Sequence, residues 1–153
     1  MEIRLATIDD VDAIALLFVE QFDIAADLHP YIMRIGGQSK QFIEETISKE
    51  ESDIFVADMG GEIVGFSSIF EKETPNFEFM VPHSYAHLMD ILVTKNHQGK
   101  GIATKLMEEA KWWATGRGLD YIELNVRPNN DSAINFYIKN GFEESMKTMM
   151  SKL

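Results

Sequence analysis

The sequence LMDILVTKNHQGKGIATKL, residues 88–106, joins a predicted strand to a predicted helix through a loop with two glycines. The segment His87–Thr94 is apolar and β-rich, which is typical of a buried strand. Ile102, Leu106 and Ala110 then recur at the spacing of one face of a helix. The stretch therefore predicts a strand, a glycine loop and a helix in succession.

The loop Gln98–Ala103 is a candidate phosphate site. The first N–H groups of a helix lack internal partners, and glycine lets an anion approach the backbone closely. Lys100 adds a mobile positive charge. Thr104 replaces the third glycine of Gly-x-Gly-x-x-Gly, and Gly-x-x-x-x-Gly-Lys is also absent, so neither of the two common nucleotide motifs is expected. On these residues alone, a helix start that binds nothing is equally compatible.

The segments on either side of this loop predict which strands run parallel and which run antiparallel. A further apolar strand, Tyr121–Val126, completes a strand–helix–strand unit whose strands should run parallel. Earlier, Ile54–Asp58 and Glu62–Glu71 flank Gly60-Gly61, which predicts an antiparallel hairpin. We therefore expect a single α/β domain, residues 1–153, with three layers: a central mixed β-sheet and helices on both faces.

The remaining elements follow from capping residues and apolar spacing. Thr7 is placed to cap a first helix, whose apolar face includes Ile14 and Phe18, and the segment Ile24–Gly37 looks less regular. The other expected elements are a strand at Glu2–Ala6, a helix at Ser39–Lys49, the end of the central helix near Gly116, a helix at Asp131–Lys139 and a closing strand at Phe142–Leu153.

Composition narrows the classes of partner. The net charge of −11 disfavours binding to nucleic acid, and the acidic surface serves either a cationic substrate or solubility alone. The absence of cysteine excludes thiolate metal sites and cysteine nucleophiles, and the four histidines lack metal spacing. A protein without a bound metal is therefore expected. No apolar run approaches the roughly 20 residues of a membrane span, so a cytoplasmic location is expected.

Two motifs resemble those of the GNAT superfamily of N-acetyltransferases. Gln98-x-x-Gly101-x-Ala103 looks like the family's pyrophosphate loop, Arg/Gln-x-x-Gly-x-Gly/Ala. Upstream, Ile91-Leu92-Val93 stands where the family has a bulged strand whose backbone pairs with pantetheine. Downstream, the family's second cofactor motif is matched by Asn130-x-x-Ala133-x-x-x-Tyr137-x-x-x-Gly141-Phe142.

The resemblance implies a GNAT-like fold and acetyl-CoA as cosubstrate, bound where strands 88–94 and 119–126 part. It implies transfer of the acetyl group to a primary amine of a small molecule or peptide by direct attack, without an acyl-enzyme. A regulatory module that binds acyl-CoA without turnover is the alternative. The residues expected to bind the cofactor are Ile91, Leu92, Val93, Gln98, Gly99, Lys100, Gly101, Ile102, Ala103, Thr104, Asn125, Asn130 and Tyr137.

Two residues are the expected catalytic groups. Tyr137 matches the family's general acid, and a phenol with a pKa of about 10 can protonate a leaving thiolate. Its alternative role is a core tyrosine. Asp90 interrupts an apolar strand and is a candidate general base; a salt-bridged strand residue or an anchor for the substrate's charge is equally compatible. Glu71 and Glu20 are further candidates for the base.

Asn125, Asn130 and Trp112 each have two interpretations. Some family members carry a glutamate base at the position of Asn125, so a base is not expected there. Asn130 precedes a helix, where it can cap the helix or reach pantetheine. Trp112 lies off the apolar face of its helix and fits either surface packing or a homodimer contact. The amine acceptor is expected against residues 22–37 and 73–83.

Overall fold

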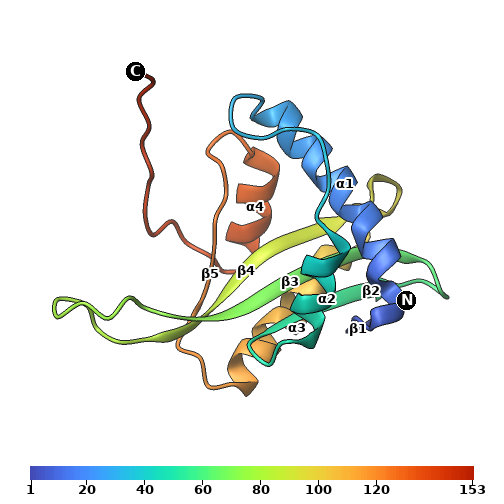
Figure 1. Ribbon diagram of the computed structural model, residues 1–153, viewed down its shortest axis with the longest axis horizontal. Coiled ribbons are helices and arrows are strands. Elements are labelled where there is room, and N and C mark those ends of the chain that lie inside the picture. Colours follow the sequence, from blue (N-terminus) through green and yellow to red (C-terminus); the bar gives the residue numbers. More distant parts are fainter.

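The computed structural model describes residues 1–153 and contains one five-stranded sheet (Figure 1). Its strands lie in chain order, β1-β2-β3-β4-β5. The first four pair antiparallel, and β4 pairs parallel with β5. The expected mixed sheet is confirmed. The strand bounds are β1 Glu2–Leu5, β2 Ser52–Asp58, β3 Ile63–Glu73, β4 Ser84–Val93 and β5 Ile122–Leu124.

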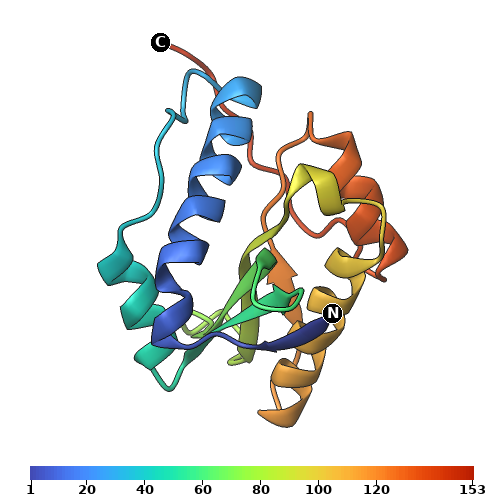
Figure 2. The ribbon, with the colours of Figure 1, turned by 90° about the vertical axis from the view of Figure 1, so that its right-hand side faces the viewer.

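Helices cover both faces of this sheet, so the three-layer architecture is also confirmed. Figure 2 shows α1 and α2 on one side of the sheet and α3 and α4 on the other. The helix bounds are α1 Val11–Leu28, α2 Lys40–Ser48, α3 Ile102–Gly116 and α4 Asp131–Lys139, with two short 3₁₀ turns, η1 Ile8–Asp10 and η2 Lys95–His97.

Two apolar cores follow from the alternation of side chains along the strands. In β2, Ile54 and Val56 face α1 and α2, whereas Phe55 and Ala57 face α3. A strand buried on both faces needs apolar residues in an unbroken run, and β2 has one. From α3, the buried face of Ile102, Leu106, Met107, Ala110 and Ala114 fills the second core. The helical spacing of the sequence therefore placed this face correctly.

Polar contacts fix the starts of the first two helices. The backbone N–H of Thr7 donates to a carboxylate oxygen of Asp10 at 2.7 Å, which joins the two residues at the start of η1. Arg4 on β1 binds Asp10 and Asp58 at 2.8 and 2.9 Å, and this ion pairing lowers the pKa of Asp10 to about 2. Ser39 accepts a hydrogen bond from the N–H of Phe42 and caps α2.

Three expected boundaries are wrong. The helix α1 continues through Leu28, because Ala25, Ala26 and Leu28 favour helix, and it ends just before Pro30, which disfavours helix in the residue that precedes it. The strand β5 is shorter than 121–126, since only Ile122–Leu124 pair with β4. The tail 142–153 contains no strand, because no neighbouring strand in the molecule pairs with its backbone.

Candidate active site

A bulge in β4 turns Asp90 toward α1. Ser68 of β3 pairs with Asp90 and Ile69 pairs with Leu88, so Met89 has no partner of its own. In a regular strand, Leu88 and Asp90 would point to the same face. Instead Leu88 packs in the core beneath α3, whereas Asp90 contacts a side chain of α1. The extra residue therefore changes the face on which the carboxylate lies.

Asp90 is held by two donors. The Nε2 of Gln21 donates to Asp90 Oδ1 at 2.5 Å, and the hydroxyl of Ser68 donates to Asp90 Oδ2 at 2.8 Å. Burial raises the pKa of Asp90 above its ordinary value, while these two hydrogen bonds and the charge of His87 lower it in part. A carboxylate that is desolvated and fixed in place has the properties of a general base.

Tyr137 lies on α4, on the opposite face of the sheet from α1. Its ring packs edge-on against Phe136 and Phe142, with centroids 5.5 and 5.9 Å apart. Burial raises the pKa of its hydroxyl, and the charge of Asp90 raises it further. The hydroxyl forms no hydrogen bond within the protein, yet it is not among the fully buried unpaired oxygens. Tyr137 is thus a neutral donor whose proton is free for a ligand.

The strands β4 and β5 part beside these groups. They pair only from Ala86–Leu88 to Ile122–Leu124, after which β4 continues alone to Val93. In an α/β sheet, ligands bind where neighbouring strands diverge in this way. Beyond Leu88, the backbone of Ile91–Val93 pairs only with β3, so its other edge is free for a ligand. The bulge lies at Met89, just before these residues.

The loop after β4 presents a run of free amides. No backbone N–H from Gln98 to Thr104 donates a hydrogen bond within the protein. Gly99 and Gly101 adopt left-handed φ angles of 74° and 78°, which a residue with a side chain rarely adopts. The Nε2 of Gln98 donates to the carbonyl of Val93 at 3.0 Å and ties the loop to the end of β4. Free amides at the start of α3 are a suitable anion site.

The other candidate site residues are Asn130, Asn125, Glu20 and Glu71, and each has its own surroundings. The Oδ1 of Asn130 accepts from the N–H of Ala133 at 3.2 Å, so Asn130 caps α4. Asn125 is exposed directly after β5. Glu20 accepts from the N–H of Lys95 at 3.2 Å, and Glu71 pairs with Arg117 at 3.3 Å. These contacts give both glutamates structural partners.

Gln21 and Ser68 are site residues that the sequence did not reveal. Gln21 lies seven residues after Ile14, at the spacing of the buried face of α1, and a polar residue there is an available signal. Ser68 is fully buried in the otherwise apolar strand β3. The Oε1 of Gln21 is buried without a hydrogen-bond partner, next to Asp90. The resemblance to the GNAT family implied a bulge in this strand at Ile91–Val93, and the structure has it just before these residues, at Met89.

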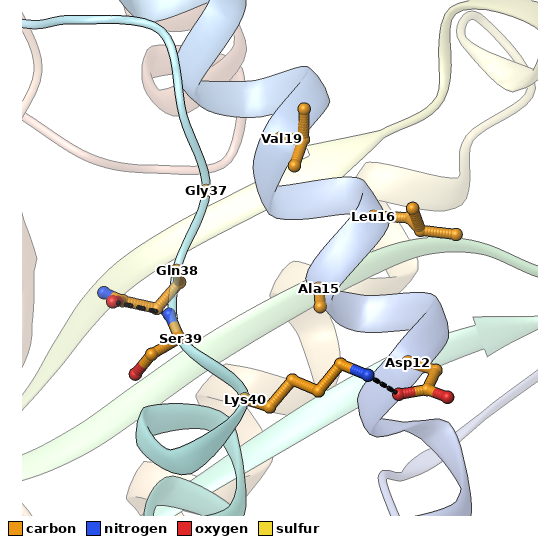
Figure 3. A pocket seen from close by; sticks show the side chains of 8 residues that line it. All are labelled: Asp12, Ala15, Leu16, Val19, Gly37, Gln38, Ser39 and Lys40. Carbon is orange, nitrogen blue, oxygen red and sulfur yellow. Dashed lines mark hydrogen bonds and ion pairs between the residues drawn. The ribbon is translucent and has the colours of Figure 1, made fainter.

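A hollow of about 660 Å³ lies elsewhere, between α1 and residues 37–40 (Figure 3). Lys40 and Asp12 form an ion pair of 2.7 Å within its wall. Leu16 and Val19 add exposed apolar surface on α1. None of the residues around Asp90 lines this hollow.

Four further observations bear on the expectations for metal, membrane, dimer contact and acceptor. Nowhere do three or more histidine or acidic side chains cluster as a metal site would require. None of the helices combines the length and the apolar character needed to cross a bilayer. Trp112 is 69% exposed on α3. Residues 73–83 close the β3–β4 hairpin at its far end from Asp90 and project from the body (Figure 1), so their expected contact with the acceptor is not supported.

The sequence matches the family model described as "Acetyltransferase (GNAT) family" over residues 14–142. The chain belongs to the acetyltransferase (GNAT) family. A protein of Archaeoglobus fulgidus named as an uncharacterized N-acetyltransferase is 30% identical over 90% of this chain and 89% of its own length. Streptothricin acetyltransferase from Escherichia coli is 37% identical over 67% of this chain and 54% of that protein.

A solved structure extends the likeness through the whole fold. A mutant of the BH1408 protein from Bacillus halodurans superposes with a TM-score of 0.95 and 26% identity, covering 100% of this chain and 99% of that chain. Members of the GNAT family are acetyltransferases that use acetyl-CoA. The GNAT chain described here is accordingly an acetyl-CoA-dependent N-acetyltransferase, and the resemblance seen in its sequence is confirmed.

Proposed function

We propose that this enzyme transfers the acetyl group of acetyl-CoA to a primary amine of a small molecule or peptide by direct attack. The observation that carries the proposal is the position of a half-buried carboxylate, Asp90, on the strand that leads directly into a loop of free amides, residues 98–104. The loop suits the pyrophosphate of the cofactor, and the carboxylate suits an amine.

The cofactor would extend from the loop into the opening between β4 and β5. The amides of Gln98–Thr104 would hold the pyrophosphate, with Lys100 adding charge. The free backbone edge of Ile91–Val93 would pair with the pantetheine arm. Asn125 and Asn130 lie at the ends of the segment between β5 and α4, on the other side of the same opening. This arrangement would bring the thioester between Asp90 and Tyr137.

The proposed chemistry needs one base and one acid. Asp90 takes a proton from the ammonium form of the acceptor, and the neutral nitrogen attacks the thioester carbonyl. The carbon–sulfur bond of the tetrahedral intermediate then breaks, and Tyr137 donates its proton to the departing thiolate. The nitrogen releases its second proton, which returns through solvent to the oxygen of Tyr137. Backbone amides near Leu92 would polarise the carbonyl. The acetyl group passes directly to nitrogen, and the chain has no cysteine to form a thioester with it.

The acceptor would bind on the α1 side of Asp90. The unpartnered Oε1 of Gln21 could accept a hydrogen bond from the acceptor amine. Glu20, Asp23 and Asp27 continue the acidic character along α1, which favours an amine that carries further positive charge. The Escherichia coli relative is named for streptothricin, which is a statement about that protein alone.

A regulatory module that binds acyl-CoA without turnover is the alternative. The pKa values of the Tyr137 hydroxyl and of the Asp90 carboxyl group are both raised by burial. Such shifted groups favour catalysis, because cofactor binding alone does not require them. A turnover assay with acetyl-CoA and a panel of amines, amino acids, polyamines and peptides separates the two. Three further expectations stay predictions: a single domain spanning 1–153, a cytoplasmic location, and the absence of metal, nucleic-acid and membrane partners. The single domain is supported by the two apolar cores, which lie on the two faces of one sheet.

Gly101→Val is expected to weaken coenzyme A binding tenfold or more, about 1.4 kcal/mol. Gly101 has a left-handed φ of 78°, so a valine strains the backbone and moves the amides that would contact the pyrophosphate. Gly118→Val is a matched control, because Gly118 has a φ of 69° and equally open surroundings at the other end of α3. Calorimetry that finds equal losses of affinity in both folded variants argues against this site.

Gln21→Leu is expected to move the acidic limb of the pH–rate profile to higher pH and to change the plateau little. The hydrogen bond from Gln21 stabilises ionised Asp90 and lowers its pKa, so its removal makes the base harder to ionise. Gln41→Leu, the same substitution on the exposed face of α2, is the control. An unmoved limb would show that Gln21 does not position a titrating base.

A further inference from the structure

Part of the sheet face that carries Asp90 is open to solvent. The core on this face joins α1 and α2 to β2, β3 and the end of β4. Earlier in β4, Ala86 and Leu88 point into the other core, so His87 between them points to the Asp90 face. Glu123 lies opposite His87 on β5 and shares this face, and its side chain is 47% exposed. The open part therefore begins beside Asp90 and extends along β4 and β5.

Glu123 is an exposed carboxylate that is held in one position. The Nδ1 of His87 donates to Glu123 Oε1 at 3.1 Å, and only 17% of the His87 side chain is exposed. No lysine or arginine forms an ion pair with Glu123. A free surface glutamate loses rotamer entropy when it binds a ligand. Because the imidazole already orients Glu123, a cation that binds there meets less of that cost.

An aromatic ring lies beside this carboxylate. Tyr121 comes two residues before Glu123, so it points to the same face, and it is 41% exposed. Tyr85 stacks on its ring with centroids 5.0 Å apart, and His83 packs edge-on at 5.9 Å. Burial raises the pKa of the Tyr121 hydroxyl, and the charge of Glu123 raises it further, so the ring stays neutral. A fixed ring next to a carboxylate attracts an ammonium group.

We propose that Glu123 and the ring of Tyr121 bind a second ammonium group of the acceptor, so that this enzyme prefers linear diamines and polyamines to monoamines. The inference rests on the proposed function, in which Asp90 receives the amine that is acetylated. An acceptor with two positive ends pairs with both carboxylates, whereas a monoamine leaves Glu123 without a cation.

The strand register gives the spacing of the two positions. On β3, the partners of Asp90 and His87 are Ser68 and Phe70, which are two residues apart because of the bulge. With about 3.3 Å per residue along a strand and about 4.8 Å between strands, the Cα atoms of Asp90 and Glu123 are roughly 8 Å apart. The two nitrogens of hexamethylenediamine span a similar distance when its chain is extended. A flexible linear chain therefore fits the spacing.

Neighbouring charges leave Glu123 as the position for this second cation. Lys72 points to the same face, but it lies on β3, and its ammonium is 5.5 Å from the centre of the Phe70 ring. Asp120 already accepts a hydrogen bond from the Nδ1 of His83 at 3.0 Å, at the end of this surface farther from the bulge. Neither residue supplies a positive charge to Glu123.

Calorimetry tests this subsite without turnover. With coenzyme A present, hexamethylenediamine is expected to bind about tenfold more tightly than hexylamine, which has the same carbon chain and one ammonium, because an ion pair and a cation–π contact add modest terms. Glu123→Gln should make the two affinities equal. Glu2→Gln removes the same charge from an exposed position on β1, at the other edge of the sheet, and should keep the difference. Equal affinities in wild type, a difference that survives in Glu123→Gln, or one that is lost in Glu2→Gln overturns the proposal.

Two substitutions at Tyr121 separate the ring from the hydroxyl. Tyr121→Phe should keep the preference for the diamine, because the ring contacts the ammonium. Tyr121→Leu should lose part of it. A full preference in Tyr121→Leu would contradict the role of the ring.

Turnover of the same two amines separates the subsite from the proposed function. With acetyl-CoA, wild type should acetylate both amines and favour the diamine through a lower KM, and Glu123→Gln should acetylate both with equal kcat/KM. Tighter binding of the diamine with acetylation of neither amine would contradict the proposed function and support the subsite. Acetylation of both amines by wild type with equal kcat/KM would support the proposed function and overturn the subsite.

Discussion

Tyr137→Phe is expected to slow acetyl transfer by about 10²–10⁴-fold, the usual loss when a general acid is removed. Phenylalanine keeps the ring that packs against Phe136 and Phe142, so the fold should survive. Affinity for acetyl-CoA should change little, because the hydroxyl acts mainly as charge develops on sulfur. The measurement is single-turnover acetyl transfer with whichever amine the panel identifies.

The control is Tyr85→Phe, which removes a hydroxyl from a ring that stacks on Tyr121. This variant should retain the wild-type rate. If Tyr137→Phe transfers acetyl within twofold of wild type, Tyr137 is not the acid. If it loses affinity for the cofactor while the chemical step is preserved, Tyr137 is a binding residue instead.

Asp90→Asn is expected to lower turnover by about 10²–10⁴-fold and to remove the acidic limb of the pH–rate profile. A base must be ionised, so the wild-type rate falls as pH drops through the pKa of Asp90. Burial raises that pKa, and the fall therefore begins at higher pH than for an ordinary carboxyl group. Asparagine can keep both contacts: its oxygen can accept from Gln21, and its amide nitrogen can donate to the hydroxyl oxygen of Ser68 once that hydroxyl has turned.

Stability should respond to Asp90→Asn in the opposite sense. A carboxyl group whose pKa is raised on folding favours the native state at pH below its unfolded pKa, and this contribution is lost as pH rises through the folded pKa. At neutral pH the buried charge opposes folding, so the variant should unfold at an equal or higher temperature than wild type. Asp120→Asn, on an exposed side chain, is the control for both measurements. Wild-type rate and pH profile in Asp90→Asn would leave water or another group as the base.

The architecture could be predicted because its signals are local. The loop between His87–Thr94 and Ile102 separates a strand from a helix, and the hairpin at Gly60-Gly61 fixes antiparallel pairing earlier in the chain. The helical spacing of Ile102, Leu106 and Ala110 was sufficient to predict that these residues belong to the core. The helix that connects β4 to β5 predicted that these two strands would run parallel, and they do.

The surroundings of Asp90 could not be predicted in the same way. Gln21 and Ser68 lie 69 and 22 residues from Asp90. The packing of α1 on the sheet brings Gln21 to Asp90, and the pairing of β3 with β4 brings Ser68 to it. The bulge at Met89 turns the carboxylate toward α1; the family resemblance implied a bulge in this strand, but residue type alone did not show which face Asp90 would take. The roles of Asp90, Tyr137 and the loop residues stay predictions until the variants are measured.

The error in the tail has a physical cause. Residues 142–153 have an extended, methionine-rich pattern that predicts a strand, but a strand forms only when another backbone pairs with it. One copy of the chain supplies no such backbone, so the segment stays extended and unpaired.

The central claim, direct transfer from acetyl-CoA to an amine, is tested most directly by rapid-quench mass spectrometry. The intact protein and the amine are followed together after acetyl-CoA is added. Direct transfer predicts that acetylated amine accumulates while the protein mass stays unchanged at every time, and that without amine no acetyl group leaves coenzyme A. An acetylated protein that forms before product and decays as product appears would contradict it, as would tight coenzyme A binding with no acetylation of any amine.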